Sequence, residues 1–301
     1  MKTLHTLNKI ILASLALVLS SACADLNQDG EEMDAVNKII GGQVVRNAPD
    51  HVGAVILFTQ DGPVQTCTAT LIDNDSILTA AHCWGIAPEE KAFWQANVAA
   101  GNVAVCFGES DWNPKNQALC PNNKAAQVIS FAVPNQFHTD WANHDISVAQ
   151  LGGAFPEISK PKLAKSKNHI KGDSTSFGYG AQKTRVVKNN EIVREATGDS
   201  KLRSLQRKTL PLAECNAQID NLNGPQRRAS AKNICINVNK KNNLCHGDSG
   251  GPTFIKGRLA GITSRGTSNE NRRGVVKTCD GSGPTILTNV RKFRSWIQSQ
   301  M

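Results

Sequence analysis

The chain has few aromatic side chains, and this scarcity limits what its positive charge can mean. Aromatic residues make up 5% of the 301 residues, and only one tyrosine is present. Basic residues cluster in residues 160–171 and 183–208, but no aromatic residues are interleaved with them and no nucleic-acid-binding motif accompanies them. Nucleic-acid-binding proteins usually combine a basic surface with a recognition motif or stacking aromatics. Nucleic acid is therefore not expected as a partner.

Three further absences narrow the class of protein. The seven histidines show none of the paired spacings that zinc sites need, so neither a metal nor another cofactor is expected. The sequence has no internal repeats, which excludes repeat architectures. Beyond residue 19 no apolar run is long enough to cross a bilayer as a helix.

The first 24 residues have the pattern of an export signal. Lys2 and Lys9 are positive, residues 10–19 are apolar except for Ser14, and small residues follow. The apolar stretch is about half the length that a membrane-spanning helix needs. We therefore expect a signal peptide over residues 1–24 and an exported protein.

Cys23 leaves two processing routes open. Residues 20–23, Ser-Ser-Ala-Cys, resemble a bacterial lipoprotein signal that ends before the cysteine, in which case lipidation of Cys23 would anchor the protein to the cell envelope. Alternatively, the small residues Ala22 and Ala24 would direct cleavage after Ala24 and leave the protein secreted or periplasmic.

Residues 25–38 are expected to form an acidic propeptide. They carry five acidic side chains against the single base Lys38 and have almost nothing apolar to bury, a composition that favours disorder. Of the 34 basic and 25 acidic residues of the chain, 3 and 5 lie in residues 1–38, so the remainder has a net charge of about +11. This charge is typical of a solvated surface, and it would also attract anionic surfaces or acidic proteins.

The run Cys245-His-Gly-Asp-Ser-Gly-Gly-Pro252 is the most informative segment of the sequence. Glycines on both sides allow a tight turn that exposes the hydroxyl of Ser249, and the N–H groups of Gly247 and Ser249 can point at one developing oxyanion. Such a serine needs a base to accept its proton. His82, in Thr-Ala-Ala-His-Cys, is a candidate base, and Asp145 is a candidate orienting carboxylate.

In the order His82, Asp145, Ser249, these motifs resemble the trypsin/chymotrypsin family of serine proteases, and the signal suggests a bacterial, exported member. The resemblance implies an all-β fold of two six-stranded antiparallel β-barrels with a C-terminal α-helix. It places the peptidase domain at residues 39–301, with the first barrel at about 39–155, the second at about 156–288 and the helix at about 289–300.

Local patterns agree with this fold. Residues 52–58, 66–72 and 77–80 are apolar or β-branched runs bounded by turn residues. Val290, Phe293 and Ile297 recur at helical spacing. Residues 182–199 are polar and basic, and we expect them to form a mobile loop prone to self-cleavage.

The resemblance also assigns a mechanism. Ser249 would attack a peptide carbonyl, His82 would accept its proton, and Asp145 would orient His82. Cleavage after Lys38 by an activating protease would free the amine of Ile39, which in the family pairs with the acid beside the nucleophile, here Asp248. The partners implied are protein or peptide substrates and that activating protease, and we expect a monomer.

Eight cysteines remain when Cys23 is set aside, an even number that suggests disulfides in an exported protein. The resemblance implies the pairs Cys67–Cys83, Cys215–Cys235 and Cys245–Cys279. Cys106 and Cys120 are left as the fourth pair, which matches no bridge assigned to the family.

Residues around the expected substrate pocket depart from those of trypsin. Asn243 occupies a position that is acidic in trypsin, and Leu244 follows it. An uncharged pocket cannot compensate a buried cation, so we expect an uncharged side chain before the scissile bond, unless the nearby Asp280 points inward. Four further residues are assigned to the pocket by the resemblance: His246, Ser264, Gly266 and Thr285. Arg265 stands where the family usually has tryptophan.

Two rival functions compete with an active serine endopeptidase. One is a catalytically silent homologue that acts as a surface binding or adhesion protein, which a broken triad or a missing activation site would indicate; neither is seen in the sequence. The other is a surface lipoprotein whose main role is attachment, which depends on Cys23 alone.

Overall fold

The computed structural model of the chain describes residues 39–301, except for residues 114, 116, 184, 189–190, 195–197, 225 and 272–273. The expected signal peptide, Cys23, the propeptide and Lys38 lie outside the described residues. Within the described part, no helix is both long enough and apolar enough to cross a membrane.

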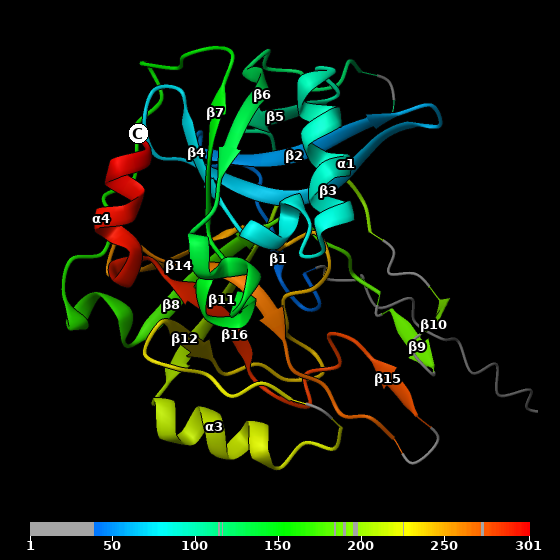
Figure 1. Ribbon diagram of the computed structural model, residues 1–301, viewed down its shortest axis with the longest axis vertical. Coiled ribbons are helices and arrows are strands. Elements are labelled where there is room, and N and C mark those ends of the chain that lie inside the picture. Colours follow the sequence, from blue (N-terminus) through cyan, green and yellow to red (C-terminus); the bar gives the residue numbers. More distant parts are fainter. Residues whose placement is uncertain are drawn as a thin grey trace, which may run out of the picture. The chain divides into compact units, whose positions relative to one another are not determined.

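Six antiparallel strands close the first barrel in the order β2-β3-β4-β7-β6-β5 (Figure 1). Their bounds are β2 Val52–Thr59, β3 Gly62–Leu71, β4 Ser76–Thr79, β5 Val103–Phe107, β6 Ala125–Ala132 and β7 Ser147–Leu151. Gln60 and Asp61 form the turn that joins β2 to β3, and Gly62, which begins β3, has a φ of +116° that an L-residue adopts only with strain. The three strand segments expected from the sequence fall within or overlap β2, β3 and β4.

The second barrel is also six-stranded and antiparallel, because β11 pairs with both β12 and β8 and so closes the sheet. Its strands are β8 Asp173–Gly178, β11 Arg203–Leu210, β12 Asn233–Ile236, β13 Pro252–Ile255, β14 Arg258–Gly266 and β16 Thr285–Asn289. Strand β1 (Gln43–Val44) adds to β11. The boundary expected at residue 39 therefore differs: the segment before β2 pairs with the second barrel, and the first barrel begins at Val52.

A third, small sheet lies outside both barrels. It has the order β10-β9-β15, with bounds β9 Val186–Lys188, β10 Glu191–Arg194 and β15 Val275–Lys277. The loop expected at residues 182–199 thus contains two strands. Val187 pairs with Val276, and β-branched residues of this kind favour strands even within a polar, basic segment.

The C-terminal helix α4 (Val290–Gln300) agrees with the expected range. Its buried side chains, Val290, Phe293 and Ile297, join the same apolar cluster as the core of the first barrel. The other helical segments were not predicted: α1 Pro88–Ala99, α2 Trp141–His144, α3 Leu212–Asp220 and the 3₁₀ turns η1 Ala81–Trp84, η2 Asn135–His138 and η3 Lys167–Ile170. Helix α1 buries only Val98 and so lacks an apolar stripe, but the Glu90 carboxylate accepts the N–H groups of Ile86 and Ala87 at its start.

Four disulfides join the same cysteines that the sequence analysis pairs: Cys67–Cys83, Cys106–Cys120, Cys215–Cys235 and Cys245–Cys279. Cys67–Cys83 joins β3 to η1, Cys215–Cys235 joins α3 to β12, and Cys245–Cys279 joins two loops. The fourth, Cys106–Cys120, lies in an apolar cluster with Val52, Ala54 and Tyr179 and ties β5 to the loop that follows it.

Replacing both Cys106 and Cys120 by alanine should lower the free energy of unfolding by about 2–4 kcal/mol, because the unfolded chain loses the constraint of a closed loop. Chemical denaturation of the two full-length proteins measures the difference, and peptide mapping without reduction identifies the bridge. Free thiols at Cys106 and Cys120 in the parent protein would contradict the pairing.

Candidate active site

His82 and Asp145 meet because the strands beside them are neighbours. His82 lies in η1, directly after β4, and Asp145 lies just before β7; β4 and β7 pair, with Thr79 opposite Ser147. The His82 Nδ1 atom lies 2.7 Å from Asp145 Oδ2, and the backbone N–H of His82 donates to Oδ1 at 2.9 Å. Both carboxylate oxygens thus fix the position of the histidine.

The carboxylate of Asp145 is completely buried and is shared between the barrels. Ser264 of β14 donates its hydroxyl to Oδ2 at 2.6 Å, and Thr288 of β16 donates to the Asp145 carbonyl at 2.6 Å. Burial raises the pKa of Asp145, but the charge of His82 and the hydrogen bonds from His82 and Ser264 outweigh burial and hold the pKa below its usual value. Asp145 therefore stays ionised at neutral pH.

The interaction with Asp145 shifts the pKa of His82 in the opposite direction, upward. Burial lowers the pKa of His82, whereas the charge of Asp145 and its hydrogen bond raise it, and the net result is a pKa above the ordinary value. The side chain of His82 remains 21% exposed, so its outer nitrogen is accessible from the cavity that it lines. This arrangement favours a histidine that is readily protonated while Asp145 holds the other nitrogen.

Ser249 lies on a tight turn that requires glycine. Gly247 and Gly250 have φ values of +91° and +79°, and a Cβ on Gly250 would lie 1.9 Å from Thr79 Oγ1. The Gly247 carbonyl accepts bonds from Thr68 Oγ1 and Gln65 Nε2, both at 2.8 Å, which fixes the peptide that follows it. Among the described residues, the N–H groups of Gly247 and Ser249 have no hydrogen-bond partner.

His82 and Ser249 line one cavity of about 600 Å³. Five of the residues assigned to the pocket line it as well: Leu244, His246, Ser264, Gly266 and Thr285. Asn243 does not line it; it is 1% exposed, and its Oδ1 accepts the Thr285 hydroxyl at 2.7 Å. Asp280 is also not among the lining residues, and its carboxylate accepts the N–H and the hydroxyl of Ser282.

Sequence reasoning missed several residues that line this cavity. Val187 and Val276 reach it from the small sheet, and Gln226 and Glu270 also line it. Arg265, which the sequence analysis noted as a departure from the family, lines it too. Val187 and Val276 belong to the short strands β9 and β15, whose pairing is not visible in the sequence. Glu270 is a carboxylate at the cavity that the sequence analysis did not consider.

Asp248, the residue before Ser249, is a completely buried acid. Its carboxylate accepts the N–H groups of Gly180 and Cys245, each at 2.8 Å. Burial raises the pKa of Asp248 to about 7, although the two hydrogen bonds and the charge of Arg203 lower it. In the described part of the chain no cation lies within salt-bridge distance of Asp248.

Ile39 lies close to the segment that contains this acid. Its side chain is completely buried in a cluster with Leu244, and the carbonyl of Ile40 accepts the N–H of Asn243 at 2.8 Å. The two residues that follow the Lys38–Ile39 bond, Ile39 and Ile40, thus contact the segment that leads into the turn carrying Ser249.

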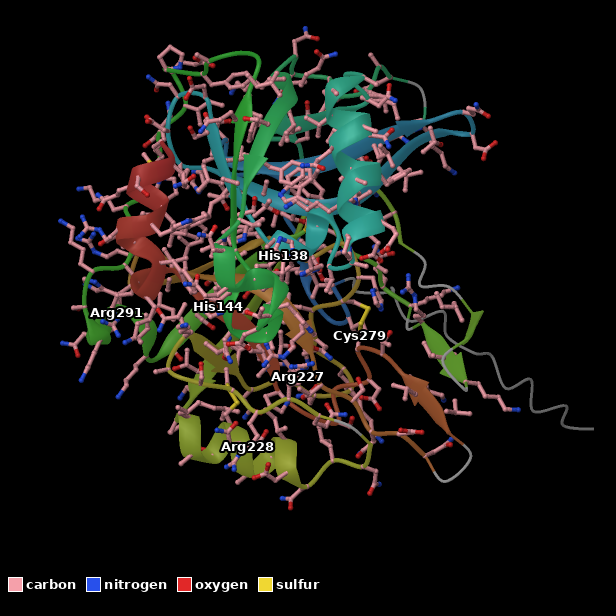
Figure 2. All side chains as sticks on the ribbon, viewed as in Figure 1. His138, His144, Arg227, Arg228, Cys279 and Arg291 are labelled. Atoms are coloured by element: carbon pink, nitrogen blue, oxygen red, sulfur yellow. A yellow bond between two sulfur atoms is a disulfide. The ribbon has the colours of Figure 1, made fainter. Side chains whose placement is uncertain are left out.

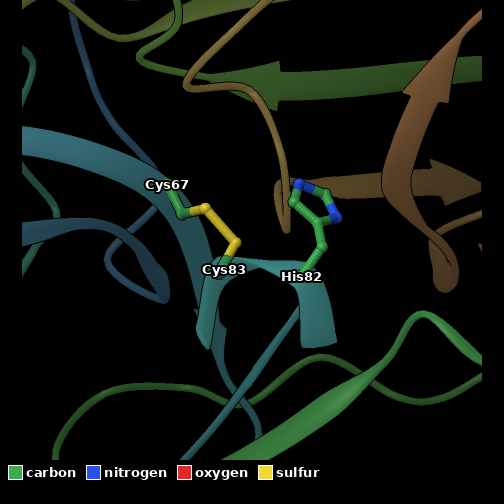
Figure 3. Close-up of side chains that lie close together, drawn as sticks. All are labelled: Cys67, His82 and Cys83. Atoms are coloured by element: carbon green, nitrogen blue, oxygen red, sulfur yellow. A yellow bond between two sulfur atoms is a disulfide. The ribbon is translucent and has the colours of Figure 1, made fainter. Parts of the chain in front are cut away.

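Cys67, His82 and Cys83 are the one group of potential metal-binding side chains found among the described residues (Figure 3). The two sulfur atoms are bonded to each other and so cannot act as thiolate ligands. The group does not form a metal site; the disulfide fixes the segment that carries His82.

Comparison with known proteins agrees with this geometry. A family model described as Trypsin matches residues 39–297. The chain is 26% identical to an alpha-fibrinogenase, albofibrase, of Trimeresurus albolabris, over 87% of this chain and 86% of that protein. It is 26% identical to brachyurin of Leptuca pugilator, over 87% and 98% of the two chains, and 23% identical to an alkaline trypsin of Manduca sexta, over 87% and 90%.

The fold and the site define a chymotrypsin-like serine endopeptidase, a hydrolase that acts on peptide or protein substrates. The chain belongs to the trypsin family. The family, the double-barrel fold and the enzyme class expected from the sequence are therefore confirmed.

Proposed function

We propose that this chain is an exported serine endopeptidase made as a zymogen, with His82, Asp145 and Ser249 as its catalytic triad. The observation that carries the proposal is the buried Asp145 carboxylate bonded to His82, in a cavity that His82 shares with Ser249. Export is supported by the four disulfides, which form in oxidising compartments, and by the composition of residues 1–24.

In the proposed reaction the Ser249 hydroxyl attacks the carbonyl carbon of a peptide bond while His82 accepts the hydroxyl proton. His82 then gives this proton to the leaving amine, and the acyl group on Ser249 is released by water through the same steps. The free N–H groups of Gly247 and Ser249 stabilise the oxyanion. Asp145 keeps His82 in the tautomer that leaves its outer nitrogen available as a base.

Substitution of Ser249 by alanine should reduce peptidase activity by about 10⁶-fold, because triad members act as a unit. The measurement is peptide hydrolysis by the two proteins after identical cleavage following Lys38. Ser268→Ala is a matched control, since Ser268 lines the same cavity without a proposed chemical role. Activity of the Ser249→Ala protein close to that of the parent would contradict the mechanism.

Activation is proposed to depend on Asp248. While Lys38 and Ile39 are joined, the Ile39 nitrogen belongs to a neutral peptide group, and the Asp248 carboxylate has no cation to offset its burial. Cleavage after Lys38 would create an ammonium group on Ile39, which is already buried near Leu244. Pairing of this ammonium with Asp248 would lower the pKa of Asp248 and stabilise the catalytic turn.

Activity of the cleaved enzyme should show a bell-shaped pH dependence. His82 must be neutral to act as a base, so activity falls as pH drops through its raised pKa. Pairing with Asp248 raises the pKa of the Ile39 amine above its usual range of about 7.7–8.0. The ion pair therefore stabilises the active conformation fully below that range, and this stabilisation is lost as pH rises through the raised pKa. Activity profiles combined with unfolding measurements at each pH separate the two limbs.

One extra residue before Ile39 is the variant that tests the switch. It should keep an ordered fold and lose most activity, because its amine is displaced from Asp248. Asp248→Asn should behave similarly, since an amide cannot form the ion pair. Normal turnover with the extra residue would rule out the switch while leaving the triad untouched.

Specificity is proposed to favour an uncharged side chain before the scissile bond. Leu244 and Thr285 line the cavity, Asn243 accepts a hydrogen bond from the Thr285 hydroxyl, and none of the three is charged. The enzyme would then cleave its own Lys38–Ile39 bond poorly and would need a second, trypsin-like protease. Glu270 is the acid at the cavity that could oppose this preference.

Purified proenzyme should therefore remain intact when it is incubated with active enzyme, and peptides with alanine or valine before the scissile bond should be cleaved faster than those with lysine. Mass spectrometry of the new N-terminus detects cleavage of the proenzyme, and kcat/KM values compare the two kinds of peptide. Rapid cleavage after Lys38 by the parent but not by Glu270→Gln would assign a basic specificity to Glu270.

A further inference from the structure

Arg265 places a positive charge inside the catalytic cavity. It follows Ser264, which binds Asp145, on the last part of β14, and it lines the cavity that contains His82 and Ser249. Its Nη1 donates to the Ala142 carbonyl at 2.7 Å, and its guanidinium carbon lies 5.8 Å from the centre of the Trp141 ring. These contacts orient the guanidinium rigidly.

Arg227 adds a second cation against the same aromatic ring. Its guanidinium carbon also lies 5.8 Å from the Trp141 ring centre, and its carbonyl accepts the Nη2 of Arg265 at 3.4 Å. Arg227 itself is exposed on the segment between α3 and β12 (Figure 2). Trp141 and the two arginines thus form a cationic platform beside the catalytic residues.

Neither Arg265 nor Arg227 forms a salt bridge within the described residues. Burial lowers the pKa of Arg265 to about 10, and Arg227 lowers it too, although Asp145 and Asp140 raise it. Asp145 is already bonded to His82 and Ser264, and the Asp140 carboxylate accepts the side-chain amide of Asn143. The Nε atom of Arg265 is buried and has no hydrogen-bond partner.

The backbone beside Arg265 is open to an extended peptide. Strand β14 pairs with β13 only as far as Ile262, so residues 264–266 have one edge without a partner strand in the described part of the chain. A substrate strand added there would place alternate side chains on the same face as its neighbours on β14. The residues that precede the cleaved bond would then pass Arg265.

We propose that Arg265, supported by Arg227, recognises an acidic side chain of the substrate among the second to fourth residues before the scissile bond. The inference rests on the proposed function, because it concerns substrates held for attack by Ser249. A carboxylate at this point would accept hydrogen bonds from a guanidinium that is oriented and only partly solvated, the geometry in which such bonds are strong. Glu270 lines the same cavity, so the polarity of the site depends on which of the two charges the substrate side chain meets.

The test uses pairs of peptides that differ only by Glu or Gln at one of these three positions, which keeps shape constant and changes the charge. The purified full chain, cleaved after Lys38, should show about tenfold higher kcat/KM for the Glu peptide at one position at least. In Arg265→Gln this ratio should fall to about one. Arg228→Gln is the matched control, because Arg228 is exposed, contacts Asp220 and has the same charge, and it should retain the preference.

The ratio of kcat/KM for the Glu and Gln peptides distinguishes recognition of the acidic side chain by Arg265 from a merely structural role of Arg265. Loss of the Ala142 contact in Arg265→Gln would slow both peptides of a pair equally and would leave the ratio unchanged. Equal kcat/KM for Glu and Gln at all three positions in the parent enzyme, or a preference that persists in Arg265→Gln, would overturn the inference with the protease activity intact. Failure of the parent enzyme to cleave any peptide, with Ser249→Ala indistinguishable from it, would instead overturn the proposed function.

Discussion

The buried carboxylate of Asp145 is the group on which the rest of the site depends. An ionised carboxylate without water around it needs several donors, and here they come from His82 in one barrel and from Ser264 in the other, while Thr288 binds the adjacent carbonyl. These bonds hold the two barrels together at the candidate active site. The β4–β7 pairing brings His82 to Asp145, and the neighbouring strands β14 and β16 bring Ser264 and Thr288.

Much of this could be predicted from the sequence because its signals are local. The glycines around Ser249 mark a backbone conformation that other residues cannot adopt, and the spacing of Val290, Phe293 and Ile297 marks the apolar stripe of α4. The hydrogen bond from Ser264 to Asp145 could not be predicted from the sequence, because the two positions are 119 residues apart and no local pattern marks Ser264.

The elements that escaped prediction share a physical reason. Helix α1 buries a single side chain, so no periodicity reveals it, although Pro88 and Glu90 are typical of a helix start. The small sheet forms only when β9 meets β15, almost 90 residues away, and neither strand has a long apolar run. Val187 and Val276 reach the cavity only because β9 pairs with β15, so the sequence alone could not assign them to it.

The pairing of β9 with β15 joins two surface segments into one structural unit. Thr278, just beyond β15, binds the His246 side chain, and the Cys245–Cys279 disulfide joins the same end of the sheet to the residues before the catalytic turn. Neither segment can be exchanged alone, because removal of one leaves the other with an unpaired strand edge. Transplantation of this cavity wall onto a related protease would require both loops and the disulfide together, so the natural diversification of this region should proceed by coordinated replacement rather than by single loop changes.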